Sequence, residues 1–194
     1  MPIRFPLFSI GILLLLNSCQ LNSPAGAPLN EPAYVLESIP GSELSYASLY
    51  DSTDNQLLER GYQMKGLKTG TWEYYEPNKE FPHKMISWAN GMYNGPYVEY
   101  SDRGHTELLA HYRNNKLHGL WTTYKFGDPT VTATYKDGQL NGVYREFDQS
   151  GKTVKEVSYQ DGQQHGFMRY YNEAGEVTLE YEYSHGKKIS GGIK

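Results

Sequence analysis

The sequence predicts an all-β fold, a linear array of about five to six antiparallel β-hairpin repeats of about 24 residues that form an elongated open sheet. Three observations support this prediction. Gly-x-x-x-Gly units recur at a nearly constant spacing, aromatic residues occupy fixed positions after each unit, and apolar and polar residues alternate between the units. Aromatic residues make up 14% of the 194 residues, which is typical of a folded chain rather than a disordered one.

The repeat is defined by the second glycine of each unit, which falls at Gly70, Gly95, Gly119, Gly142 and Gly166. Successive glycines are 25, 24, 23 and 24 residues apart, and a sixth, broken unit follows at Gly186. A hairpin of this length cannot bury its own apolar face, so we expect neighbouring hairpins to stack into a continuous core. The last unit carries Lys187, Lys188 and Lys194, which we interpret as a polar cap on the open edge of the sheet.

Each unit contains two short runs joined by turn residues. The predicted turns are Asn90-Gly91, Asn114-Asn115, Asp137-Gly138, Asp161-Gly162 and His185-Gly186. Gly, Asn and Asp tolerate the positive φ angles that two-residue hairpin turns require. The second run of each unit alternates with period two, as in residues 177–183, which predicts a strand with one buried face. No window keeps a 3.6-residue period, so we expect little helix.

Two rows of large side chains follow the glycines. The residues two positions after each second glycine are Trp72, Tyr97, Trp121, Tyr144 and Met168. The residues five positions after it are Tyr75, Tyr100, Tyr124, Phe147 and Tyr171. The two positions differ in parity, so an unbulged strand cannot turn both rows toward one core. At least one row must be core, and we take the second as the candidate exposed aromatic row, a surface that suits a protein partner or a glycan.

The first residues predict a targeting segment. Residues 1–18 combine Arg4, an apolar run from Phe5 to Leu16 and small residues before Cys19, the pattern of a signal peptide. The sequence Leu16-Asn17-Ser18-Cys19 resembles the lipobox of bacterial lipoproteins, and that resemblance implies that Cys19 is lipidated and anchors the chain to a membrane. By resemblance to lipoprotein sorting rules, Gln20 implies the outer membrane if the host is Gram-negative. The alternative is a plain secretory signal.

Residues 19–56 are predicted to form a polar, acidic tether ahead of a repeat domain at 57–194. This segment holds five acidic residues and no Lys or Arg, and it begins with Asn, Ser, Pro, Ala and Gly. Its second half also holds Tyr34, Leu36, Tyr46 and Tyr50, which allow a strand that caps the following domain.

The units Asn90–Tyr100 (Asn-Gly-Met-Tyr-Asn-Gly-Pro-Tyr-Val-Glu-Tyr) and Asp137–Phe147 (Asp-Gly-Gln-Leu-Asn-Gly-Val-Tyr-Arg-Glu-Phe) resemble MORN-type repeats. The period of 23 to 25 residues is similar to that of the MORN-variant repeats in bacterial proteins labelled YwqK-family antitoxins. The resemblance covers residues 61 to about 190. It implies rows of β-hairpins that act as scaffolds, and a partner toxin that is neutralised by binding.

Composition and motifs argue against several functions. A formal charge of −4 argues against a nucleic-acid partner bound by bulk charge. The single cysteine excludes a disulfide scaffold and a cysteine zinc site. The sequence has no His-Glu-x-x-His motif and no Gly-x-Ser-x-Gly elbow. We therefore expect no enzyme, no catalytic residue, no metal and no cofactor.

The sequence leaves three functional hypotheses. The first is a non-enzymatic, membrane-anchored lipoprotein of the cell envelope whose repeat sheet is a protein-interaction scaffold, with an antitoxin or immunity role implied by the resemblance. The alternative is binding of an envelope glycan or peptidoglycan through the exposed aromatic row. The third is a structural spacer.

Overall fold

The computed structural model describes residues 33–194, and the predicted signal peptide, Cys19 and the first part of the tether lie outside these residues. All regular structure in the described part is β-strand. The strands are β1 (Val35–Ser38), β2 (Leu44–Tyr50), β3 (Leu57–Met64), β4 (Leu67–Tyr74), β5 (Lys84–Ala89), β6 (Met92–Tyr100), β7 (Thr106–Arg113), β8 (Lys116–Leu117), β9 (Gly119–Lys125), β10 (Asp128–Lys136), β11 (Gln139–Leu140), β12 (Gly142–Phe147), β13 (Thr153–Gln160), β14 (Gln163–Tyr171), β15 (Val177–Ser184) and β16 (Lys187–Ile193). Within these residues no helix is long or apolar enough to cross a membrane.

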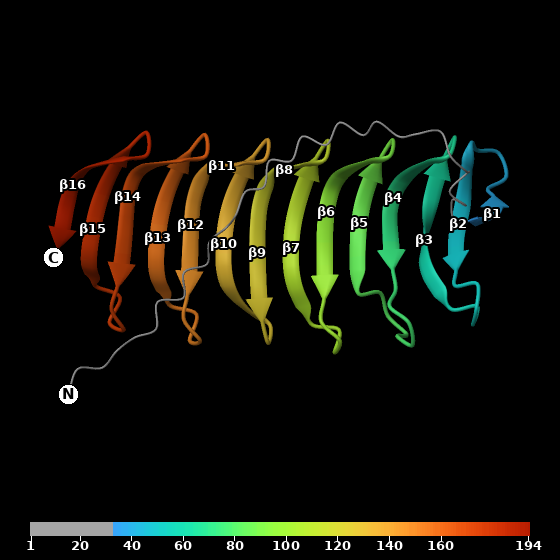
Figure 1. The fold of residues 1–194 in the computed structure, drawn as a ribbon, viewed down its shortest axis with the longest axis horizontal. Helices are drawn as coiled ribbons and strands as arrows, with labels where there is room; N and C mark the ends of the chain where they lie inside the picture. Colours follow the sequence, from blue (N-terminus) through green and yellow to red (C-terminus); the bar gives the residue numbers. More distant parts are fainter. Residues whose placement is uncertain (1–32) are drawn as a thin grey trace, which may run out of the picture. The chain divides into compact units, whose positions relative to one another are not determined.

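The strands form one open antiparallel sheet in which neighbours in sequence are neighbours in space (Figure 1). Fourteen strands follow one another from β1 to β16, while the short β8 and β11 extend the lines of β9 and β12. This arrangement confirms the predicted all-β array of hairpins. It is a single layer, so each face of the sheet meets solvent unless a partner covers it.

The predicted hairpin turns are confirmed. All ten residues of the five predicted turns have positive φ, for example Asn90 at 50° and Gly91 at 75°. Both central residues of a type I′ turn need this conformation, and its twist matches that of the flanking strands. The turns therefore fix the strand register within each hairpin, and neighbouring hairpins pair in the same register.

The two faces of the sheet differ in what they bury. Cross-strand partners share a face, and one series of such partners holds the buried apolar residues; we call this side the core face. Large and small side chains alternate along it, and the small ones are buried between the rings of neighbouring strands. The buried apolar residues among those described are Ala47, Trp72, Ile86, Ala110, Ala133 and Val157.

The sheet begins earlier than the predicted domain boundary at residue 57. Strand β1 and strand β2 pair with each other, and β2 pairs with β3, so residues 35–50 are part of the sheet rather than of a tether. Ala47 on β2 lies opposite Gly61 and is fully buried, and the ring of Tyr34 meets the ring of Trp72 edge-on at 5.7 Å. These contacts correct the predicted 19–56 tether and match the capping strand that the apolar residues of this segment allowed.

The contact between Gly61 and Trp72 generates a stability prediction. A Cβ added at Gly61 would lie 2.5 Å from Cγ of the Trp72 ring, which is held in place because its Nε1 donates a hydrogen bond of 2.7 Å to the Tyr62 carbonyl. We expect Gly61→Ala to lower the free energy of unfolding by about 1–3 kcal/mol, since the added methyl overpacks a buried ring. Urea denaturation monitored by Trp fluorescence measures the change.

Gly192→Ala is the matched control, because Gly192 has no positive φ and no atom within 4 Å of an added Cβ. This variant should stay within about 0.5 kcal/mol of the parent protein. Equal losses from the two substitutions would contradict the close packing at Trp72.

Candidate functional site

The face opposite the core face carries one unbroken row of cross-strand partners. It crosses all fourteen main strands, and we call it the central row. In order its members are Val35, Ser48, Arg60, Glu73, Met85, Val98, Leu109, Thr122, Thr132, Arg145, Glu156, Arg169, Glu180 and Gly192. We call this side of the sheet the charged face. The charged members of the central row lie toward its two ends, and its five middle members carry no charge.

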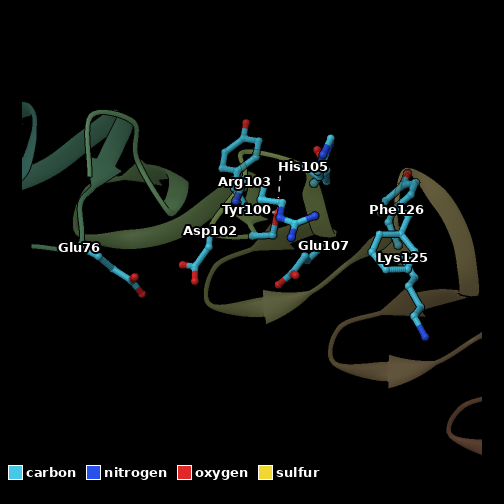
Figure 2. Close-up of a pocket in the computed structure, with 11 residues that line it drawn as sticks. Glu76, Tyr100, Asp102, Arg103, His105, Glu107, Lys125 and Phe126 are labelled. Carbon is cyan, nitrogen blue, oxygen red and sulfur yellow. Dashed lines mark hydrogen bonds between the residues drawn. The ribbon is translucent and has the colours of Figure 1, made fainter. Parts of the chain in front are cut away.

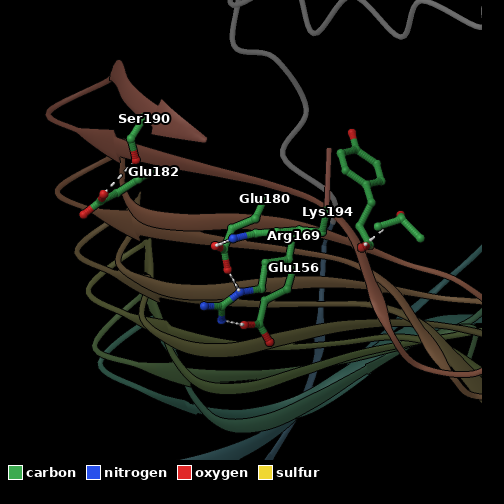
Figure 3. Close-up of polar contacts among 8 residues, drawn as sticks. Glu156, Arg169, Glu180, Glu182, Ser190 and Lys194 are labelled. Atoms are coloured by element: carbon green, nitrogen blue, oxygen red, sulfur yellow. Dashed lines mark hydrogen bonds and ion pairs between the residues drawn. The ribbon is translucent and has the colours of Figure 1, made fainter. Parts of the chain in front are cut away.

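The C-terminal part of the central row is a ladder of alternating charges (Figure 3). Arg145 Nε lies 2.7 Å from Glu156, Arg169 Nε lies 2.7 Å from Glu180, and a longer contact of 4.0 Å links Arg169 to Glu156. Lys194 extends the ladder with a contact of 2.8 Å from Nζ to Glu180. Lys194 and Arg169 donate hydrogen bonds that hold the pKa of the Glu180 carboxyl below its ordinary value.

The N-terminal part of the central row holds a second ionic cluster. Arg60 and Tyr75 both donate hydrogen bonds to the Glu73 carboxylate, Tyr75 at 2.6 Å. Burial acts to raise the pKa of Glu73, but the two donors outweigh it and the pKa lies below its ordinary value. Burial and the neighbouring Glu73 together raise the pKa of Tyr75 to about 12.

Between the two ionic parts lies an uncharged window on strands β5 to β10. Five successive members of the central row, Met85, Val98, Leu109, Thr122 and Thr132, form it. Leu120, two residues before Thr122 on the same strand face, is 47% exposed beside it. An uncharged strip of three apolar residues and two threonines, bounded by ion pairs, resembles an interface core with a polar rim.

The structure places the candidate aromatic row along one margin of this face. Tyr75, Tyr100, Tyr124, Phe147 and Tyr171 are each half-buried and stand on the opposite side from the fully buried Trp72. The row is thus separated from the row led by Trp72, as its parity implied. The tyrosine hydroxyls of the aromatic row have different partners. That of Tyr75 donates a hydrogen bond to Glu73, and that of Tyr100 contacts Met85 Sδ at 3.6 Å.

The aromatic row lines hollows at the ends of the strands. Tyr100 and Tyr124 line a hollow of about 690 Å³, which Phe126 and charged loop residues complete (Figure 2). Phe126 and Phe147 line a neighbouring hollow of about 450 Å³. Figure 2 shows Arg103 and Glu107 near Tyr100, with Lys125 and Phe126 on the far side of the hollow. These hollows are open and mixed in charge, so they suit a surface partner better than an enclosed small molecule.

Phe126 is a surface feature that the sequence analysis missed. Its side chain is 83% exposed and its φ is 55°, an uncommon conformation for a bulky residue. It occupies a two-residue turn between β9 and β10, where residues 101–105, 148–152 and 172–176 form longer loops in other hairpins. The shortest spacing between successive second glycines, 23 residues, includes this turn and was the available signal.

The core face carries a further polar feature that sequence reasoning missed. Lys68 Nζ lies 2.7 Å from Glu59 and 4.0 Å from the centroid of the Trp72 ring. The ammonium group therefore combines an ion pair with a cation–π contact. No periodic signal marks Lys68, because the same unit position holds Tyr93, Leu117, Leu140 and Gln164 elsewhere.

Within residues 33–194, no group of three or more His, Cys, Asp or Glu side chains is arranged to hold a metal ion. Histidine contacts there are local: His118 lies 3.5 Å from Asp137, and the rings of His165 and His185 meet edge-on at 5.0 Å. None of these contacts combines a nucleophile, a base and an orienting group.

Comparisons with known proteins give no family assignment. No family model matches the chain, and no curated protein matches it. Two crystal structures of TarM are similar to part of it, one of them a mutant of the S. aureus protein in complex with fondaparinux, α-GlcNAc-glycerol and UDP. Their sequence identities are 14% and 15%, and each match has a TM-score of 0.35 and spans 50% of this chain and 20% of TarM. This likeness carries no argument about function.

The hydroxyl of Tyr75 generates a pH prediction. We expect Tyr75→Phe to raise the pKa of Glu73, because it removes one of two donors that favour the carboxylate. The low folded-state pKa of Glu73 stabilises the sheet above the ordinary carboxyl pKa, and this stabilisation is lost as pH falls through the folded value. Tyr75→Phe should therefore reduce the stability that the sheet loses in acid through protonation of Glu73.

NMR titration of the Glu73 side-chain carboxyl carbon measures this shift. Tyr100→Phe is the matched control, since the Tyr100 hydroxyl contacts Met85 and not a carboxylate. An unchanged Glu73 pKa in Tyr75→Phe would refute the hydrogen bond.

Proposed function

We propose that this chain is a non-enzymatic lipoprotein of the cell envelope whose hairpin sheet is a scaffold that binds another protein. The observation that carries the proposal is the uncharged window on the charged face, with exposed Leu120 beside it and exposed Phe126 in the turn between β9 and β10. Protein interfaces concentrate apolar and aromatic residues in a centre from which charge is depleted. The resemblance to MORN-variant repeats supports a scaffold. In an antitoxin-like role, the partner of this scaffold would be a toxin that it neutralises by binding.

The anchor is part of the same proposal. A lipidated Cys19 would hold the sheet at a membrane, because several acyl chains bind far more strongly than one. Val35 begins the first strand 16 residues after Cys19, so the connecting segment spans at most about 55 Å when extended. That reach would keep the sheet near the membrane and leave it free to meet a partner in the envelope.

We expect Cys19→Ala to move the protein from the membrane fraction to the soluble fraction, because the substitution removes the lipid attachment site. Fractionation of cells followed by detection of the protein measures this change. Conservative Gln20→Asn is the control and should leave the protein in a membrane fraction. Equal membrane retention of Cys19→Ala would refute the lipid anchor.

The protein-binding surface is tested by affinity purification of the membrane-extracted protein with mass spectrometry of the bound species. We expect a stoichiometric protein partner that is lost in Leu120→Asp and in Phe126→Asp, because each places a charge in an apolar contact. Loss of about tenfold or more is the expected size for such a change at an interface centre.

Leu67→Asp is the matched control, since Leu67 is 49% exposed at the start of β4 and does not belong to the window. Partner binding that survives Leu120→Asp and Phe126→Asp would contradict the proposed surface.

A glycan ligand is the second candidate, and the spacing of the aromatic row favours it. Members of the row are two strands apart, which is about 10 Å. Half-buried rings at regular spacing beside open hollows offer stacking surfaces to a linear polysaccharide. Co-sedimentation with peptidoglycan that falls in Tyr100→Ala and Tyr124→Ala, but not in Tyr159→Ala on the core face, would favour this candidate over a protein partner.

A further inference from the structure

The two end strands of the sheet differ in charge and are both exposed. Every residue of β1 is exposed, as is every residue of β16 except Gly192. Residues 33–56 hold four acidic side chains and no Lys or Arg, whereas residues 183–194 hold three lysines and no acidic side chain. Among the described residues, neither β1 nor β16 has a second neighbouring strand. The sheet therefore has an acidic edge and a basic edge, each with unpaired backbone groups.

Exposed aliphatic side chains accompany these charges. Val35 and Leu36 on β1 are 55% and 54% exposed, and Ile189 and Ile193 on β16 are 59% and 89% exposed. Lysines on an edge strand often serve only to keep other strands away. Here β1, at the opposite edge, offers the acidic side chain of Glu37 to pair with them.

The register shows how the two edges would fit. The central row begins at Val35 and ends at Gly192. On the core face, Leu36 pairs with buried Ala47 at one end, and Tyr181 pairs with Gly191 at the other. A second copy placed at the end of the first, in the same register, would set Val35 opposite Gly192 and Leu36 opposite Gly191. Val35 and Leu36 would then each lie beside a glycine, which repeats the large-and-small alternation of the core face.

Strand direction also permits this contact. All neighbouring strands are antiparallel and the main path holds fourteen of them, so β1 and β16 run in opposite directions. A copy that is merely translated along the array presents its β1 antiparallel to β16 of the preceding copy. The antiparallel ladder then continues across the junction with the hydrogen-bond pattern used inside the sheet.

We propose that this protein associates head to tail through its sheet edges, with β16 of one copy pairing with β1 of the next copy. Glu37 lies on the charged face because it pairs with Tyr46, and Lys187 lies on the same face opposite Ser184. In the proposed register Glu37 is opposite Ser190, so Lys187 is its diagonal neighbour on one side of the junction. The contact is heterologous, so it generates open chains of copies rather than a closed dimer. This inference stands on the sheet edges alone and does not rest on the proposed partner or anchor.

Cysteine cross-linking of the full chain tests the junction directly. Opposed residues of an antiparallel pair lie within the Cα separation that a disulfide requires. We expect a mixture of Val35→Cys protein and Gly192→Cys protein to form a cross-linked pair under mild oxidation, while each protein alone stays at the background set by Cys19 in the unsubstituted chain. The doubly substituted chain should form a ladder of higher oligomers. Cross-linking of either single variant with itself, or no cross-linking in the mixture, would overturn the proposal.

A charge exchange supplies an independent test by sedimentation velocity at low salt. We expect Glu37→Lys or Lys187→Glu to weaken association about two- to fivefold, as for an exposed ion pair, and the double variant to restore it. Lys136→Glu, on an exposed hairpin in the middle of the sheet, is the matched control and should leave association unchanged. Sedimentation as a monomer at every concentration, or as a dimer that grows no further, contradicts head-to-tail pairing.

Discussion

The alternation of large and small side chains across the core face is the interaction on which the rest of this structure depends. A single-layer sheet has no second layer to cover its apolar face, so its core must form between neighbours within that face. Ala110 and Ala133 are buried because the rings of Tyr97, Trp121 and Tyr144 come from the strands on either side. The glycine turns make this packing possible, since they fix the register in which a large residue on one strand lies opposite a small residue on the next.

Because the core forms between neighbouring side chains of one face, the opposite face does not have to contribute to it. That face keeps its outer strands together with ion pairs that are partly exposed, and such pairs contribute little stability each. Their arrangement matters more than their strength: the charges of the central row lie toward its two ends, and Met85, Val98 and Leu109 stand in its uncharged middle. A face that needed only solubility would carry charge throughout, so the uncharged window is the part of the surface that stability and solubility leave unexplained.

The sequence predicts the fold well because its signals are local and repeated. Turn residues at Asn90-Gly91 and Asp137-Gly138 act within four residues, and period-two alternation acts within one strand. The start of the sheet was misplaced because β1 and β2 carry no Gly-x-x-x-Gly unit; they join the sheet through long-range contacts of Ala47 with Gly61 and of Tyr34 with Trp72. The candidate aromatic row could be assigned to one face by parity, but the uncharged window could not be found by scanning one unit, since it exists only where residues of five strands share a register row.

The end strands of the sheet are held differently from the inner strands. Inside the sheet every strand is held on both sides, so opening one there breaks two ladders, whereas an end strand is held by one ladder and opens most easily. An array can limit this weakness with a polar cap or with another sheet. The basic β16 has features of a cap, yet Gly191 and Gly192 give it no side chain at the positions opposite Tyr181 and Glu180. Val35 and Leu36 have the opposite property, apolar side chains with no neighbour beyond them among the described residues. Strand β16 lacks side chains where β1 presents exposed apolar ones. A polar cap alone does not explain this complementarity, whereas pairing with another sheet does.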